Sequence, residues 1–141
     1  MDGIGSESWG EMKAFYAIGI QQSDLQVQIA NACHVLKVEL IPDMLINAQL
    51  LQRSDAFEFA QHGIPFVYGI GLPGDMAEVG ARFGPWLRDT THYEYDKIGP
   101  SWNWHGVQKY AQFFTILGMS IANKTESPAW EPSSPFRRPR R

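Results

Sequence analysis

Apolar residues near the start of the chain form a short run, then a helical repeat, then a second run. Residues 13–20, KAFYAIGI, combine aromatic and branched side chains, which is typical of a buried strand. From Leu25 to Leu36 the apolar positions recur at i, i+4, i+7, i+8 and i+11, which predicts an amphipathic helix with Ser23 as its N-cap. VELIPD, at 38–43, predicts a second strand that ends at its proline, because proline lacks an amide donor.

A second helix and a third strand are expected before residue 72. Ser54 is the expected N-cap of a short helix in which Phe57 and Ala60 face inward. Gly63 is expected to close this helix in the left-handed conformation, which glycine adopts without strain. The apolar run IPFVYGIG, at 64–71, then predicts a strand.

The second half of the chain contains one clear helix. Residues 72–100 are rich in Gly and Pro and predict a long irregular segment of the kind that often carries functional sites. Within 101–123, apolar residues in alternating steps of three and four predict a long helix with one wide buried stripe. Its members are Val107, Tyr110, Phe114, Leu117 and Ile121.

Strands that alternate with helices predict an α/β fold with a mixed or mostly parallel sheet flanked by helices. In such folds ligands bind at the carboxyl ends of the strands, so the loops that follow strands are the places to look for chemistry.

The charge of the chain argues against a nucleic-acid ligand. Charged residues make up 19% of the 141 residues and the net charge is −3, which does not give the broad basic surface that phosphate backbones require. No apolar stretch approaches the roughly 20 residues of a membrane-spanning helix, so no membrane span is expected.

The last 18 residues differ from the rest of the chain. Residues 124–141 contain five Lys or Arg against two Glu, and residues 1–123 contain seven against thirteen Asp or Glu, a net charge of −6. Four of the nine prolines lie in 124–141, with no apolar repeat. This composition predicts a flexible arm, with a partner-binding peptide as the alternative.

Three places in the sequence combine carboxylates with serine or histidine. Zn²⁺ takes three or four oxygen, nitrogen or sulfur ligands, so a convergence of these places at strand ends would suit zinc. The single cysteine, Cys33, falls on the apolar side of a predicted helix and is expected to be a small buried residue. The three places are Asp2 in MDGIG, Ser54 with Asp55, and Asp89, His92, Glu94 and Asp96 in RDTTHYEYD.

Three long stretches resemble, in order and spacing, the carboxyl-terminal half of the co-catalytic zinc aminopeptidases of metallopeptidase family 28, which also includes glutaminyl cyclases. They are FYAIGIQQSDLQVQIANACHVLKVELIPD, RSDAFEFAQHGIPFVYGIG and YEYDKIGPSWNWHGVQKYAQFFTILGMSIAN. The resemblance covers residues 1–123 and leaves 124–141 as a separate Pro- and Arg-rich tail.

The resemblance implies roles for five residues. Asp2 matches a zinc-binding aspartate that ends a strand, and Ser54 and Asp55 match a Ser-Asp-His stretch beside the metal site, where they would support the ligands. The histidine of that stretch is replaced here by alanine, which neither coordinates metal nor forms hydrogen bonds through its side chain. The position of the family's last zinc ligand, a histidine, is Asp89, and His92 could replace it after a local realignment.

These departures define the expected function. The family's upstream zinc ligands and general base have no counterpart before Asp2, so the chain alone is expected to hold zinc, the one implied cofactor, weakly or not at all. We therefore expect a non-catalytic, metallopeptidase-like domain. One alternative is an active zinc aminopeptidase that another half completes and whose substrate is a peptide. The other is an interaction subunit in which a protein partner or a second copy covers an exposed apolar face.

Overall fold

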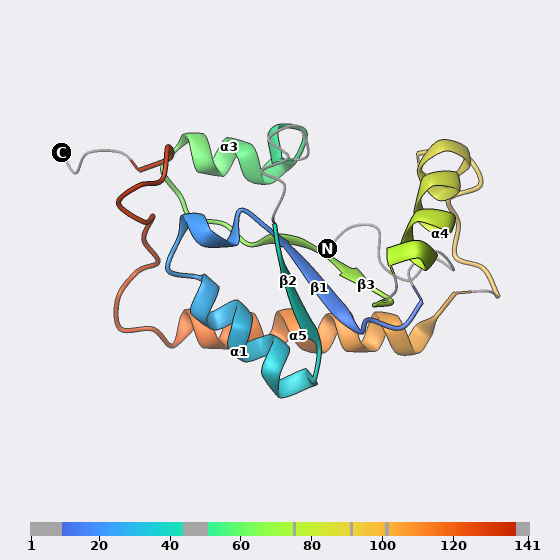
Figure 1. The fold of residues 1–141 in the computed structure, drawn as a ribbon, viewed down its shortest axis with the longest axis horizontal. Helices are drawn as coiled ribbons and strands as arrows, with labels where there is room; N and C mark the ends of the chain where they lie inside the picture. Colours follow the sequence, from blue (N-terminus) through green and yellow to red (C-terminus); the bar gives the residue numbers. More distant parts are fainter. Residues whose placement is uncertain (1–9, 44–50, 75, 91, 101, 138–141) are drawn as a thin grey trace.

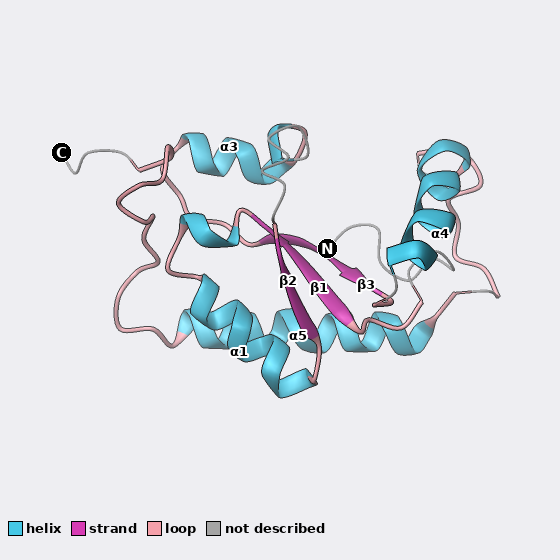
Figure 2. Cartoon of the chain, in the orientation of Figure 1, coloured by secondary structure: helices cyan, strands magenta, loops and turns pink. Residues whose placement is uncertain are grey.

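The computed structural model describes residues 10–43, 51–74, 76–90, 92–100 and 102–137. Helices surround a small sheet in these residues (Figures 1 and 2). The elements are β1 (Ala14–Ile18), the short 3-10 helix η1 (Ile20–Gln22), α1 (Gln26–Leu36), β2 (Glu39–Pro42), α3 (Asp55–Gln61), β3 (Tyr68–Leu72), α4 (Met76–Asp89) and α5 (Trp104–Ala122).

The sheet is mixed, as the sequence predicts for this fold class. Its strand order is β2-β1-β3, with β1 parallel to β2 and antiparallel to β3. Tyr16 lies opposite Ile41 on one side and Ile70 on the other, so these three residues share one face of the sheet. Phe15 and Ala17 occupy the opposite face, because successive residues of a strand alternate between faces.

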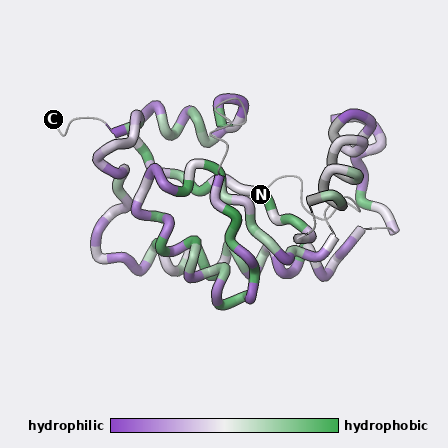
Figure 3. The backbone as a smooth tube through the Cα atoms, viewed as in Figure 1, coloured by the Kyte–Doolittle hydropathy of each residue, from purple (hydrophilic) through white to green (hydrophobic). Residues whose placement is uncertain are grey.

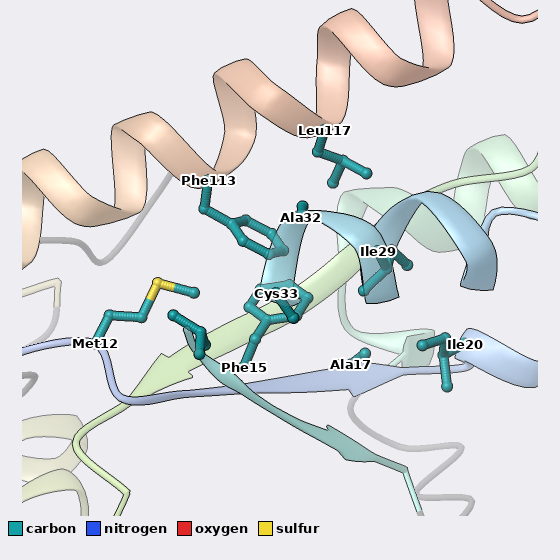
Figure 4. Close-up of a cluster of buried hydrophobic side chains, with 10 residues drawn as sticks. Met12, Phe15, Ala17, Ile20, Ile29, Ala32, Cys33, Phe113 and Leu117 are labelled. Carbon is teal, nitrogen blue, oxygen red and sulfur yellow. The ribbon is translucent and has the colours of Figure 1, made fainter. Parts of the chain in front are cut away.

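The main core lies between the face of the sheet that carries Phe15 and the helices α1 and α5 (Figure 4). The rings of Phe15 and Phe113 are 4.4 Å apart between centroids, and both side chains are fully buried. Leu117 and Cys33 complete the contact from α5 and α1. Figure 3 shows hydrophobic residues, in green, along the strands that border this core. Burying each large side chain contributes about 1.5–3 kcal/mol, so the core is a main source of stability.

Two glycines in β3 leave space for aromatic rings. A Cβ atom added to Gly69 would lie 2.5 Å from the Phe15 ring and 2.5 Å from the Tyr16 carbonyl oxygen. A Cβ added to Gly71 would lie 2.8 Å from the ring of Tyr110. The rings therefore rest directly on the backbone of β3, which only glycine allows at these positions.

The N-terminus of α1 differs from the expectation. The predicted N-cap, Ser23, is wrong by two residues, because the helix begins at Gln26 with Leu25 as its N-cap. Ser23 is instead buried and forms an isolated bridge with Trp130, more than a hundred residues further along the chain. A long-range backbone pairing has taken the place of local capping.

The prediction for α3 is largely confirmed. Ser54 occupies the N-cap position, Ala60 is buried, and Gly63 has a left-handed φ of 79°. The Ser54 hydroxyl does not cap the helix, because it donates to the Leu51 carbonyl at 2.7 Å. The strand predicted for 64–71 is shorter than expected and begins at Tyr68.

The prediction of an irregular segment over 72–100 is wrong for its first half. The helix α4 occupies Met76–Asp89 and contains Pro85. Its glycines and proline lower helix propensity, which led to the wrong prediction. The sequence does carry a helical repeat here at positions 76, 79, 83 and 86.

The long helix α5 is confirmed, but Phe113, one of the residues that it buries most deeply, is not among those that were predicted. Phe113 and Leu117 are buried, whereas Tyr110, Phe114 and Ile121 pack at the margin of the core. Asn103 caps the helix, because its side-chain oxygen accepts a hydrogen bond from the Gly106 amide at 2.8 Å. None of the helices in the described residues is both long enough and apolar enough to cross a bilayer.

Residues 124–137, predicted as a flexible arm, instead lie against the body of the protein. Lys124 Nζ is 2.6 Å from Asp24 Oδ2, and the Ala129 amide donates to Asp24 Oδ1 at 2.9 Å. Trp130 is buried and its ring contacts those of Phe66 and Phe136. Two aromatic residues and paired backbone groups thus order a segment whose overall composition is typical of disorder.

We expect Gly69→Ala to lower the free energy of unfolding by at least about 2 kcal/mol, because the added methyl group overlaps a fixed backbone oxygen. Urea unfolding measures this change. Gly80→Ala is the matched control, since nothing lies within 4 Å of the added Cβ in α4, and it should stabilise the protein by about 0.5–1 kcal/mol. Equal effects of the two substitutions would contradict the packing described for β3.

The contact of the C-terminal segment with Asp24 should depend on pH. Burial acts to raise the pKa of Asp24, but hydrogen bonds from Lys124 and the Ala129 amide outweigh it and lower the pKa overall. A lowered pKa in the folded state stabilises the protein above the unfolded value of about 4, and this contribution is lost as the pH falls through the folded pKa.

Asp24→Asn should therefore cost about 1 kcal/mol at pH 7, after allowance for solvent screening, and progressively less below pH 4. Urea unfolding of both proteins between about pH 7 and pH 2 tests this, with Lys124→Met as the partner control. A difference that does not change with pH would show that the ion pair contributes nothing.

Candidate functional site

Of the three residues predicted to bind zinc, the structure describes Asp89 and His92. Asp2 lies outside the described residues. Asp89, at the end of α4, is exposed and accepts two hydrogen bonds from Arg88, from Nε at 2.8 Å and from Nη2 at 2.6 Å. The hydrogen bonds from this guanidinium lower the pKa of Asp89. The carboxylate is thus already paired with a cation.

His92 lies just beyond α4 and is exposed, with a left-handed φ of 65°. Glu94 and Asp96 follow it in a series of turns and are exposed as well. Ser54 is the N-cap of α3 and Asp55 its first residue, whereas Asp89 ends α4, a separate helix that lies well apart from α3 in Figure 1. Among the residues that the structure describes, no three His, Cys, Asp or Glu side chains are grouped so that they could hold a metal ion. The roles predicted for these residues therefore stay predictions.

A partly buried polar pair that the sequence did not predict lies at the carboxyl end of the parallel strands. The Tyr16 hydroxyl donates to Asp43 Oδ1 at 2.6 Å, and Asp43 is only 5% exposed. The Asp43 amide donates to the Ala17 carbonyl, which extends the ladder past the end of β2. Gln21 donates from Nε2 to the Asp43 carbonyl at 3.2 Å. Backbone contacts on both sides therefore hold this carboxylate in place.

This pair is suited to a structural role more than to acid–base catalysis. Burial and the hydrogen bond to Asp43 raise the pKa of Tyr16 to about 12, so the phenol stays protonated and acts as a donor at neutral pH. A group with such a pKa is far from the operating range of a general base. Sequence spacing gave no signal for the pair, because it depends on the register of two strands.

The clearest surface feature is a group of aromatic and apolar side chains between α4 and α5, which we call the aromatic surface. Tyr95 and Ile98 are each 70% exposed, Tyr93 is 59% exposed and Trp104 is 57% exposed. Trp102 is half-buried and its ring contacts that of Trp104. Exposed apolar side chains of this size, gathered in one short segment, commonly mark a site of contact with another molecule.

The tryptophans of the aromatic surface are held in place. The ring centroids of Trp102 and Trp104 are 5.5 Å apart, and Trp102 Nε1 donates to the Lys97 carbonyl at 3.2 Å. Trp104 is the first residue of α5, directly after the capping residue Asn103. This ring contact and hydrogen bond restrict the two side chains, which would reduce the conformational entropy lost when a partner binds them.

No protein-family model matches the chain, and comparisons with curated proteins and with solved structures find no match either. Function therefore has to follow from the residues themselves and from their placement.

We expect Tyr16→Phe to cost about 1–3 kcal/mol, because the buried Asp43 carboxylate loses a donor. Tyr95→Phe, which removes a hydroxyl from a 70% exposed residue, is the control and should cost less than about 0.5 kcal/mol. Since the folded pKa of Tyr16 is raised to about 12, its contribution is complete below pH 10 and is lost as the pH rises toward 12. The difference in ultraviolet titration between wild type and Tyr16→Phe should have its midpoint near pH 12, and a midpoint near 10 would contradict the assignment.

Proposed function

We propose that this chain is an interaction domain of metallopeptidase-like architecture without peptidase activity of its own. The observation that carries the proposal is the aromatic surface, in which two tyrosines and an isoleucine lie exposed in the same short segment as two tryptophans whose rings contact each other. Trp and Tyr are the residues that most often dominate the binding energy of protein interfaces.

The donor residues present support the absence of catalysis. Tight zinc binding needs several deprotonated ligands that are preorganised together, and loss of most of them lowers the affinity steeply. At the position where the resemblance expects a histidine ligand, this chain has Asp89, whose carboxylate is bound by Arg88. The metallopeptidase-like part of the proposal rests on the sequence motifs alone.

Metal content and peptidase activity test the catalytic part. After incubation with zinc and desalting, elemental analysis should find well under one zinc ion per chain. No chelator-sensitive hydrolysis of an aminoacyl-nitroanilide is expected. Two tightly held zinc ions together with chelator-sensitive turnover would overturn the proposal in favour of an active zinc aminopeptidase. In that event Asp2→Ala and His92→Ala would show whether the predicted donors hold the metal.

Light scattering over a range of protein concentrations tests the interaction part. We expect association that Tyr95→Ala or Trp104→Ala weakens by about tenfold or more, because buried aromatic anchors dominate interfaces. Met119→Ala is the matched control, since Met119 is a 62% exposed apolar residue of α5 outside the aromatic surface. A protein that stays monomeric, or that associates equally well in all three variants, would contradict a contact role for this surface.

A further inference from the structure

The chain itself carries a segment whose chemistry complements the aromatic surface. Residues 137–141 read RRPRR, with four arginines and no acidic residue. The guanidinium group of arginine is planar and stacks on the faces of Trp and Tyr, and it pairs with carboxylates through two parallel hydrogen bonds. A ligand for the aromatic surface should offer both kinds of contact.

We propose that the aromatic surface of one copy binds the arginines at the C-terminus of a second copy. This inference rests on the proposed function, because it names the partner of the same surface.

The charges at the aromatic surface favour an arginine ligand. Glu94 and Asp96 alternate in sequence with Tyr93 and Tyr95, and all four side chains are exposed. A guanidinium group at this place would meet aromatic faces and carboxylates within a few residues. The net charge of −6 on residues 1–123 and the excess of arginine after residue 136 add a long-range attraction between the two parts.

Arg137, the first of these arginines, directly follows a segment that packs against the body of the protein. Trp130 is buried, and the ring of Phe136 contacts those of Trp130 and Phe57. A turn follows, in which the Arg137 amide donates to the Ser134 carbonyl at 3.2 Å. Arg137 is exposed, so the arginine-rich end begins where the anchored segment stops.

The C-terminal arginines cannot reach the aromatic surface of their own chain. α5 has 19 residues and so spans about 28 Å, with Trp104 at its start and residues 124–137 after its end. These residues then pack against Asp24, just before α1, and against α3, at the opposite end of the molecule from α4 (Figure 1). The four residues after Arg137 span at most about 14 Å.

The contact therefore joins the tail of one copy to the aromatic surface of the next. Such a head-to-tail contact uses two different surfaces on each copy, so it produces rings or open chains rather than a symmetric dimer. A complementation experiment distinguishes this arrangement from any symmetric one.

The experiment uses two full-fold variants, each defective in one surface. One carries Trp104→Ala and keeps the tail, and the other ends at Arg137 and keeps the aromatic surface. In light scattering, we expect each variant alone to associate at least about tenfold more weakly than wild type, and an equimolar mixture to form one-to-one heterodimers. Arg→Lys at 138, 140 and 141 should weaken association about three- to tenfold, because lysine keeps the charge but loses the planar stacking group.

Different results separate this inference from the proposed function. If the variant that ends at Arg137 associates like wild type while Trp104→Ala does not, the tail is not the ligand, although the aromatic surface still is a contact. If Arg→Lys has no effect, any basic segment serves equally and the inference is overturned. If the mixture does not form heterodimers, the contact is not head-to-tail, and the inference fails as well.

Discussion

The packing of Phe15 between a bare strand backbone and Phe113 is the contact on which the rest of the structure depends. Glycines at 69 and 71 bring β3 and the aromatic rings into direct contact, so that α5 lies close over the sheet. α5 in turn determines where two functional parts are placed. The aromatic surface ends at its first residue, Trp104, and the ordered C-terminal segment follows its last turn. A larger residue at position 69 or 71 would therefore disturb more than the local core. It would also shift α5, and with it the aromatic surface and the C-terminal segment at the two ends of this helix.

The C-terminal segment shows how a few specific contacts can outweigh composition. Its prolines and charges are typical of chains that cannot offset the entropy of ordering. Trp130 and Phe136 supply the apolar burial that the average composition lacks, and Asp24 accepts hydrogen bonds from both Lys124 and the backbone. The segment also replaces a local cap, because Ser23 pairs with Trp130 instead of starting α1. These particular residues order the segment, although its overall composition is typical of disorder.

The sequence was sufficient for elements with a strong period and insufficient for those set by distant contacts. The strands near residues 14 and 39 and the helix after residue 103 follow from apolar runs and repeats, and the mixed α/β class follows from their order. The antiparallel direction of β3 and the pairing of Tyr16 with Asp43 depend on register, which no local pattern encodes. α4 was missed because its Gly and Pro residues obscured a helical repeat. Of the predicted metal-site residues, Ser54 and Asp55 belong to α3 and Asp89 to α4, and Asp2 lies outside the described residues.

The proline in β2 has a consequence for how copies of the chain can meet. The amides of Glu39 and Asp43 donate to the carbonyls of Lys13 and Ala17. The backbone groups of Leu40 and Pro42 therefore point away from β1, toward the margin of the described sheet. Because proline has no N–H, a strand from another molecule that paired with β2 would lack one backbone hydrogen bond at this position. Growth of the sheet from one molecule into the next is thereby discouraged on this side. Polymerisation through backbone pairing, the usual origin of amyloid, is disfavoured along this strand.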